Sequence, residues 1–448
     1  MLSIDESRAA TERLVERAIA AGADCADVLY AGSRSTGVDV RLGELEDVTR
    51  SEGEEIGLRL FLGNRSASVS SSDLSAEALG ELVRRAKAMA AEAPEDPFAG
   101  LAPKDMLGEA PFADLDLVDS SGTDPAELRC RALAAESAAL AVPGVTNSSG
   151  GSAGESRATI ALATSDGFAA AYSATAFSCA AGVIAGTGGA MQRDHASHRS
   201  RHLADLESAE EVGRLAGERA VARLNSVRPR SGVMPVLFDP RVSNSLLGHL
   251  SGAINGAAVA RKSCFLQDRL GTSVFAKGIT IIDDPLRPRG LRSRPFDGEG
   301  LPVSPTMLID DGMLTGWMAD SASARQLGIA PTGHASRSVG GRPGASPSNF
   351  YMVAGKRSRE ELLAAFPEAL LVVELIGHGV NPVTGDYSRG AVGFLVRDGE
   401  IGPAVQEITI AANLVDMFAT LEPASNLEFR RGVDAPTILV PEMTVATA

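Results

Sequence analysis

Apolar positions in the first part of the chain change from a helical period to a strand period. Leu14, Val15 and Ala18 share one face of a helix predicted over residues 5–22, with charged residues on the other faces. Short runs of alternating apolar and polar residues follow, and turn pairs such as Gly43-Glu44 separate them. The pattern predicts an antiparallel meander with strands at 26–30, 36–42, 45–52, 56–62 and 66–71.

Helix-start signals mark the next part of the chain. Ser75 precedes a helix predicted to run to residue 91, and Asp124-Pro125 opens a second one that runs to residue 141. Residues 94–107 contain three prolines and are interpreted as an extended, linker-like stretch. A further helix is predicted at 207–225, and long strands are predicted at 145–151, 156–165 and 168–185.

The segment Arg228-Pro229-Arg230 is the best candidate for a domain boundary, between domains at 1–227 and 228–448. After a strand at 233–238, Asp239-Pro240 is predicted to start the helix that carries His249. The pairs Asp311-Gly312 and Asp398-Gly399 suit the positive φ angles of type I′ turns, so each predicts a hairpin. The remaining predictions are strands at 306–309, 313–318, 370–376, 391–396, 407–410 and 437–440, and a glycine-rich loop at 333–348.

Helices and strands do not alternate strictly, which favours an α+β fold over a doubly wound parallel sheet. At 448 residues the chain is too long for one ordinary core. We therefore predict N-terminal helices packed on an antiparallel-rich sheet, and a C-terminal antiparallel β-rich domain with helices. Because aromatic residues make up only 4% of the chain, we expect cores built from Ala, Leu, Val and Ile.

The net charge and the cysteine content limit the kinds of binding partner and the cellular compartment that we expect. A net charge of −15 argues against nucleic-acid or anionic-membrane binding, since either would need a basic surface. The four cysteines are widely spaced and form no C-x-x-C pair, which favours reduced thiols. Residues 1–7 lack the basic and apolar pattern of a signal peptide, and no apolar run is long enough to span a membrane. We therefore expect a cytoplasmic protein.

One histidine cluster is a candidate metal site. His195, His198 and His202 have spacings that would bring their side chains together on a helix. Three neighbouring arginines, at 193, 199 and 201, disfavour a bound cation. We favour a solvated polar loop or helix here, while an enzyme that uses these histidines remains a third possibility.

Three further segments allow a functional and a structural reading. His249 is a ligand or general base, or else a packed helix histidine at a subunit interface. The pair Arg261-Lys262 binds either a peptide carboxylate or the carbonyls at the end of the preceding helix. In residues 384–391, Asp386 and Arg389 could pair across a tight turn, and the loop either lines a peptide chamber or positions the next strand.

An ordered set of short motifs carries a family resemblance over nearly the whole chain. The strongest is Thr384-Gly385-Asp386-Tyr387-Ser388-Arg389-Gly390-Ala391, followed by a strand at 407–411. The others lie at 57–63 with 68–74, 247–250 with 261–263, 293–298, 323–325 with 332–335, and 441–443. In this order they resemble the TldD/PmbA family, and specifically its PmbA (TldE) branch.

The resemblance implies a two-domain α+β subunit of a hetero-oligomeric zinc metallopeptidase that acts on unfolded or modified peptides. In the family, the TldD-type chain supplies an H-E-x-x-x-H helix. The matching positions here run from Gly248 to Ala253, so both histidines are absent and His249 stands at the glutamate position. One imidazole cannot hold a catalytic zinc, which takes three protein ligands.

The resemblance therefore implies no catalytic residue, no metal ligand and no cofactor in this chain, with zinc in a TldD-type partner. Expected partners are that subunit, a peptide substrate and, for the chain alone, a second copy. The alternative is a partner-independent, homo-oligomeric peptide-binding or regulatory protein. Candidate chamber or interface residues are His249, Arg261, Lys262, Asp386, Tyr387, Ser388 and Arg389.

Overall fold

The computed structural model describes residues 1–447, and its N-terminal helices begin where the capping residues predict. Ser75 accepts the backbone N–H of Ala78 at the start of α2, and Asp124 accepts that of Glu127 at the start of α3. Both predicted helix starts are confirmed. The four helices of this half are α1 (Ile4–Ala20), α2 (Ala76–Glu92), α3 (Pro125–Leu140) and α4 (Ala209–Ala222). Single 3-10 turns occur at Lys104–Met106, Gly188–Ala190 and Leu203–Asp205.

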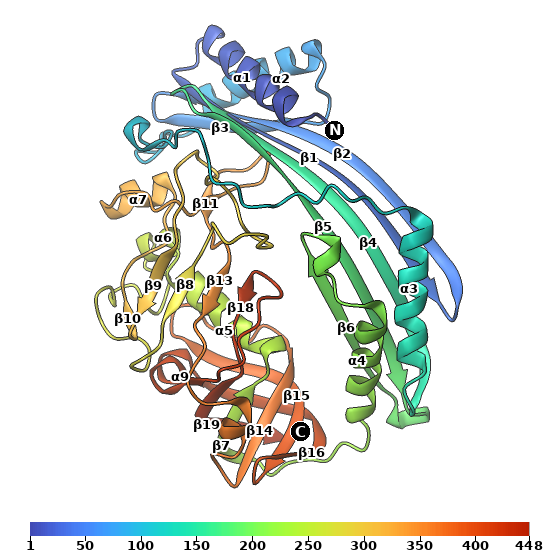
Figure 1. Cartoon of the computed structure of the whole chain (residues 1–448). Helices are drawn as coiled ribbons and strands as arrows, with labels where there is room; N and C mark the ends of the chain where they lie inside the picture. Colours follow the sequence, from blue (N-terminus) through green and yellow to red (C-terminus); the bar gives the residue numbers. More distant parts are fainter. Residues whose placement is uncertain (448) are drawn as a thin grey trace.

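Six antiparallel strands form one sheet in the order β3-β2-β1-β4-β5-β6. Figure 1 shows these strands as a long, curved arc, with α1 and α2 at one end and α3 and α4 at the other. The bounds are β1 (Cys25–Arg41), β2 (Glu44–Leu62), β3 (Arg65–Ser71), β4 (Val145–Thr164), β5 (Ala169–Ala185) and β6 (Gln192–Ser200).

The strands are longer than the sequence pattern predicts. The predicted strands at 26–30 and 36–42 are one strand, β1, because Ser33 continues the ladder opposite Gly53 of β2 and Ala158 of β4. In the same way 45–52 and 56–62 form β2, and 145–151 and 156–165 form β4. Polar residues in the middle of each pair had indicated a turn, but pairing on a neighbouring strand keeps them extended.

The C-terminal half contains a ring of five strands. The sheet order is β16-β15-β14-β7-β19-β17, and β16 also pairs with β19, which closes the ring. Within it, β7 runs parallel to β14, and the other pairs are antiparallel. The ring strands are β7 (Gly232–Phe238), β14 (Glu368–Ile376), β15 (Asp386–Arg397), β16 (Glu400–Asn413) and β19 (Ile438–Thr447). The short strand β17 (Glu422–Pro423) lies outside the ring and pairs with β19.

A second C-terminal sheet has the order β10-β9-β8-β13-β18. Its strands are β8 (Ile281–Asp283), β9 (Thr306–Asp310), β10 (Met313–Leu314), β13 (Phe350–Met352) and β18 (Val433–Asp434). The helices of this half are α5 (Pro240–Ala253), α6 (Gly256–Ala260), α7 (Ser321–Leu327), α8 (Arg359–Leu363) and α9 (Leu414–Thr420). The antiparallel-rich mixture of helices and sheets confirms the α+β class.

Both predicted Asp-Gly hairpins are present. Asp311 and Gly312 have φ angles of 46° and 84°, and Asp398 and Gly399 have 49° and 85°. They join β9 to β10 and β15 to β16. Two local predictions are wrong: β10 ends at Leu314 instead of 318, and the predicted loop at 333–348 contains a small ladder of β11 (Ala335–Ser336) with β12 (Gly344–Ala345).

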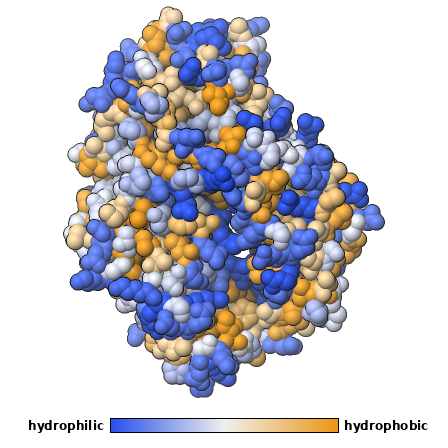
Figure 2. All heavy atoms as spheres, in the orientation of Figure 1, coloured by the Kyte–Doolittle hydropathy of each residue, from blue (hydrophilic) through white to orange (hydrophobic). Residues whose placement is uncertain are grey.

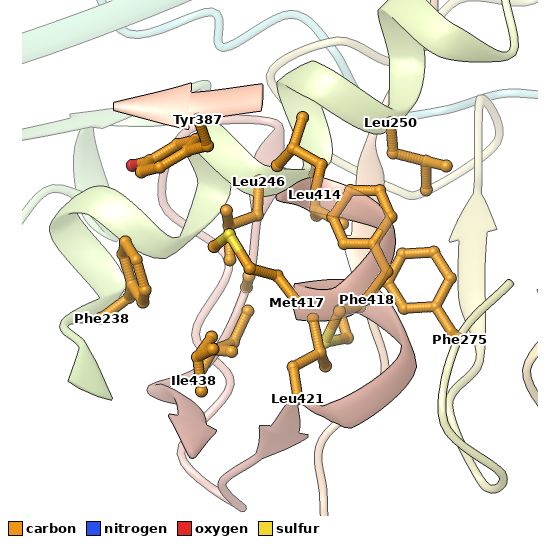
Figure 3. Packing of buried hydrophobic residues seen from close by; sticks show 14 of the residues in the cluster. Phe238, Leu246, Leu250, Phe275, Tyr387, Leu414, Met417, Phe418, Leu421 and Ile438 are labelled. Atoms are coloured by element: carbon orange, nitrogen blue, oxygen red, sulfur yellow. The ribbon is translucent and has the colours of Figure 1, made fainter. Parts of the chain in front are cut away.

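One large apolar cluster fills the C-terminal half. Leu246 and Leu250 of α5 pack with residues of α9 and of the ring strands (Figure 3). Phe275 and Phe418 stack with ring centroids 4.4 Å apart. Six buried aromatic side chains belong to this cluster, so this core is not built from Ala, Leu, Val and Ile alone. Over residues 1–447, no helix is both long and apolar enough to cross a membrane.

A buried ionic cluster joins the two halves. Asp27 of β1 pairs with Arg59 of β2 and with Arg337 of the C-terminal half, and all three side chains are buried. Arg59 Nε donates to Asp27 Oδ2 at 3.0 Å. Burial raises the pKa of Asp27, but the two guanidinium charges outweigh it and hold that pKa below its usual range. The carboxylate therefore stays charged and fixes the C-terminal loop on the N-terminal sheet.

Candidate functional site

Helix α5 presents one packed face and one bare face. Asp239 caps its start by accepting the backbone N–H of Arg241, and Pro240 occupies the first turn. Its apolar face, at Val242, Leu246, Leu247 and Leu250, is buried in the C-terminal core. On the other face, no heavy atom of residues 1–447 lies within 4 Å of a Cβ built on Gly248 or Gly252. The surface where the related motif would place an imidazole therefore carries no side chain.

The residues at the motif positions do not fit a zinc ion. Gly248 has no side chain, and Ala253 is 3% exposed within the core. His249 offers one imidazole, and its Nε2 has no hydrogen-bond partner in the described part of the chain. Across residues 1–447, no group of three or more His, Cys, Asp or Glu side chains is arranged to hold a metal. A single nitrogen donor falls short of the three protein ligands of a catalytic zinc.

His249, Tyr387 and Arg389 come together beside this bare face. The rings of His249 and Tyr387 meet edge to face, with centroids 5.9 Å apart. Tyr387 is 1% exposed, and Figure 3 shows its hydroxyl pointing away from the labelled apolar side chains. Tyr387 Oη, His249 Nε2 and Arg389 Nε are buried polar atoms without a hydrogen-bond partner in residues 1–447. This is the strongest concentration of unsatisfied polar groups near α5.

The charges in this cluster are set by burial. Burial, and then the positive charge of Arg389, lower the pKa of His249. Burial also raises the pKa of the Tyr387 phenol. At neutral pH the two rings are therefore uncharged, and Arg389 carries the only charge of the three.

The structure separates Asp386 and Ser388 from the cluster. The predicted pairing of Asp386 with Arg389 is wrong, because both residues lie in β15 and a separation of three places them on opposite faces of a strand. Asp386 instead accepts hydrogen bonds from Thr384 Oγ1 at 2.6 Å and Asn413 Nδ2 at 3.2 Å. The backbone N–H of Ser388 donates to the Gly379 carbonyl at 2.7 Å.

Arg261 and Lys262 follow α6 and are exposed. Their backbone N–H groups close the helix, with Arg261 donating to the Ala257 carbonyl and Lys262 to the Val259 carbonyl. In the described chain neither side chain donates to a helix carbonyl, so the predicted side-chain cap is wrong. Lys262 has a φ of 54°, in the left-handed region that ends helices.

The three clustered histidines do not converge. The predicted loop or helix is wrong, because residues 192–200 form β6 and pair with β5 along their length. His195 and His198 point to opposite faces of this strand, and the side chain of His195 is 79% exposed. His198 Nδ1 accepts the backbone N–H of Glu207 at 3.1 Å, and His202 Nε2 lies 2.9 Å from the Asp116 carbonyl. The three histidine side chains therefore contact different groups and do not share one site.

Three adjoining cavities lie between the two halves, where β6 and α4 face α5 and residues 426–435. Their volumes are 210, 340 and 560 Å³. Arg430 and Arg431 line both the first and second cavities, and His195 and Arg241 line both the second and third. Figure 2 shows a hollow between the two halves with hydrophilic residues around it. We refer to these three cavities together as the seam.

Arginine is the most frequent residue type among those that line the seam. Twelve line it, at 193, 199, 201, 219, 223, 241, 287, 289, 359, 389, 430 and 431. Six carboxylates accompany them, at 194, 205, 239, 374, 428 and 434. Sequence reasoning found only the basic stretch at 193–201, because the other arginines come from segments far apart in the chain.

An ion network at the third cavity holds the halves together. Asp194 of β6 lies 2.9 Å from Arg223 Nε and 3.0 Å from Arg241 Nη1. Arg223 also pairs with Glu374 of β14 at 2.7 Å. Asp194 and Arg223 are buried, so their geometry is fixed by partners on both sides of the seam.

Comparisons with known proteins match the whole chain. Family models described as PmbA/TldA metallopeptidase domain 1, central domain and C-terminal domain match residues 26–90, 119–224 and 231–447. "Metalloprotease PmbA" of Escherichia coli O157:H7 is 39% identical over 448 residues, covering 98% of this chain and 97% of that protein. A "Metalloprotease PmbA homolog" of Haemophilus influenzae is 34% identical, covering 98% and 96%.

A TldD-type relative and two solved structures complete the comparison. A "Metalloprotease TldD homolog" of Haemophilus influenzae is 27% identical over 45% of this chain and 42% of that protein. A putative modulator of DNA gyrase from Bacteroides thetaiotaomicron has a TM-score of 0.91 at 23% identity, covering 100% of both chains. TldE from Thermococcus kodakarensis has a TM-score of 0.87 at 22% identity, covering 98% of this chain and 100% of that chain. At these identities the two structures show the shared fold.

Proposed function

Because this chain belongs to the PmbA/TldD family, we propose that it is a non-catalytic subunit of a heteromeric zinc metallopeptidase. A TldD-type partner supplies the zinc, and this chain shapes the chamber that receives unfolded or modified peptides. The observation that carries the proposal is the bare face of α5. Gly248 and Ala253 stand where the related motif has imidazoles, and His249 is the single remaining donor.

The chemistry of this chain's own residues is binding and orientation. Gly248 and Gly252 leave space along α5, so a peptide can approach the helix backbone closely. His249 and Arg389 are only partly buried beside that space and offer an uncharged and a charged hydrogen-bonding side chain, whereas Tyr387 is fully buried. When bound in the partner, zinc activates water for attack on the peptide bond. The four free cysteines accord with a cytoplasmic complex.

The test compares this chain alone with this chain coexpressed with a TldD-type partner. Zinc is measured by elemental analysis on protein purified without a metal-binding tag, and cleavage is measured on an unfolded peptide. We expect substoichiometric zinc and no cleavage for the chain alone, and chelator-sensitive cleavage for the pair. Near one zinc per chain, with chelator-sensitive cleavage by the chain alone, would overturn the proposal.

A matched variant sharpens the test. Gly248→Ala adds only a methyl group to the bare face of α5, where the surrounding space is open. If the partner holds the metal, the coexpressed pair keeps its zinc content in Gly248→Ala, and any loss of cleavage in this variant reflects weaker peptide binding. The matched substitution of a metal-binding histidine in the partner abolishes both.

A further inference from the structure

The seam has a charge opposite to that of the whole chain. The protein carries a net charge of −15, whereas twelve arginines and six carboxylates line the three cavities. A positive cleft on a negative molecule focuses the field and attracts anions to that place. The concentration of arginines needs an explanation beyond solubility, because like charges held close together oppose folding.

Most of this positive charge has no carboxylate partner. Seven of the twelve arginines form no ion pair within 4.0 Å among the residues that the structure describes. Arg199 and Arg287 have neither an ion pair nor a side-chain hydrogen bond there. Among the described residues, the side chain of Arg431 donates only to the Pro240 carbonyl, at 3.0 Å. These three guanidinium groups line the first cavity.

The neighbouring groups hold this charge in place without neutralising it. Arg287 lies 3.4 Å above the centroid of the Phe429 ring, which fixes the plane of its guanidinium group. Arg201 donates to the backbone carbonyls of Thr175 and Gly290 at 3.1 and 3.2 Å. Burial, and then the nearby charge of Arg199, lower the pKa of Arg201. A bound anion would relieve this repulsion.

The two carboxylates that line the first cavity, Asp205 and Asp434, already have hydrogen-bond or ion-pair partners. Asp434 accepts the backbone N–H groups of Arg430, Arg431 and Gly432 at 2.9 to 3.0 Å. Asp205 pairs with Arg289 at 3.0 Å. Neither is placed to neutralise Arg199 or Arg287, so the cavity keeps a net positive charge.

We propose that the seam binds acidic segments of the peptide substrate, whose carboxylates pair with Arg199, Arg287 and Arg431. This inference rests on the proposed function, since it names the class of peptide that the chamber selects. Three adjoining cavities that share lining residues, with Arg431 in all three, suit an extended chain better than a single small anion. Guanidinium groups pair with carboxylates in a bidentate geometry, which gives specificity as well as attraction.

The experiment measures the anisotropy of two labelled, unfolded peptides added to the full chain. The peptides have the same sequence except that alternate Glu residues in one are Gln in the other. We expect the acidic peptide to bind at least about tenfold more tightly at 0.1 M salt, and to lose this advantage at 1 M salt. Over that range the screening length falls from about 10 Å to about 3 Å.

Matched variants connect the effect to the seam. We expect Arg199→Gln/Arg287→Gln to weaken acidic-peptide binding about tenfold and to leave the Gln peptide unchanged. The charge-preserving Arg199→Lys/Arg287→Lys keeps most of the preference. The control Arg34→Gln/Arg50→Gln removes two arginines from β1 and β2, far from the β6 edge of the sheet. We expect it to leave the binding of both peptides unchanged. Thermal unfolding of each variant verifies that it is folded.

Three outcomes would overturn the inference. Equal binding of the two peptides would show that charge plays no part. Equal weakening of both peptides by Arg199→Gln/Arg287→Gln would indicate a structural effect. Tight binding of inorganic pyrophosphate without a preference for the acidic peptide would assign the seam to a small anion. In each case, partner-dependent cleavage of the Gln peptide would leave the proposed function intact, so the two failures are distinguishable.

Discussion

In the N-terminal half, the residues buried between the sheet and helices α3 and α4 are mostly alanines, whereas the C-terminal half buries phenylalanine, leucine and methionine in one continuous cluster. Small residues let backbones approach: a Cβ on Gly213 of α4 would lie 2.0 Å from the Ala135 carbonyl oxygen of α3. Large residues instead fill a thick interior around α5.

This difference in packing indicates that the two halves have different structural roles. Helices α3 and α4 pack closely on one end of the N-terminal sheet because their buried side chains are small. In the C-terminal half, the large apolar cluster packs against α5 and so positions the residues at His249, Tyr387 and Arg389. The seam forms where the two meet, so its shape depends on both modes of packing and on the ionic contacts between them.

The largest expected effect tests the contrast between the two interiors. Phe418→Ala should reduce the free energy of unfolding by about 4 kcal/mol, because it opens a cavity beside Phe275. Val183→Ala removes less volume from the alanine-rich interior of the N-terminal half and should cost about 2 kcal/mol. Urea denaturation of both variants measures the difference, and equal losses would break the comparison.

The next effect concerns the buried ionic cluster between the halves. Asp27→Asn leaves Arg59 and Arg337 buried without their charged partner and should cost about 3 kcal/mol. Asp39→Asn is the matched control, since it removes an exposed carboxylate from the same strand. Chemical denaturation followed by fluorescence compares the two. A loss for Asp27→Asn no larger than that for Asp39→Asn would show that the cluster does not hold the halves together.

Gly57 of β2 sets how closely the C-terminal loop at residues 333–348 approaches the N-terminal sheet. A Cβ on Gly57 would lie 1.8 Å from the Val339 carbonyl oxygen, so Gly57→Ala must displace the loop and should cost about 2 kcal/mol. Gly53→Ala on the same strand meets no atom of residues 1–447 within 4 Å and should be neutral. Limited proteolysis of residues 333–348 should become faster only in Gly57→Ala. Equal rates in both variants would argue against the contact.

The smallest effect per pH unit is a pH dependence at Glu299, which lies 3.8 Å from Arg59 at the contact between the two halves. Burial raises the pKa of Glu299 to about 7, from 4.5 for an exposed glutamate. The folded state therefore binds a proton that the unfolded state has released between these values. The contribution of Glu299 to stability is complete below pH 4.5 and is lost as the pH rises to about 7, by at most about 1.4 kcal/mol per pH unit.

Replacing the carboxyl group isolates this contribution. In the native chain, the contribution of Glu299 to the free energy of unfolding should fall as the pH rises from 4.5 to 7. Glu299→Gln should remove this fall. His334 acts in the opposite direction, because burial lowers its pKa to about 4. The measured quantity is therefore the difference in unfolding free energy between the two chains across this range. A constant difference would show that Glu299 is ionised in the folded state.

Features that depend on neighbours along the chain could be predicted before the fold was known. Ser75, Asp124 and Asp239 predict helix starts because a cap bonds to backbone two or three residues away. The Asp-Gly pairs at 311 and 398 predict hairpins because their φ angles are local properties. The missing imidazoles at 248 and 253 are likewise read directly from the sequence.

Only the tertiary structure decided features that depend on distant partners. Ser33 and Gly53 are extended because each lies opposite the other in a ladder, although their own propensities indicate a turn. His195 and His198 diverge because β5 pairs with their segment, which sets a period of two. The seam joins arginines as distant as 193 and 431, and no local pattern marks them as one surface. Capping and turn energies act within a few residues, whereas strand pairing and charge clustering come from the folded chain as a whole.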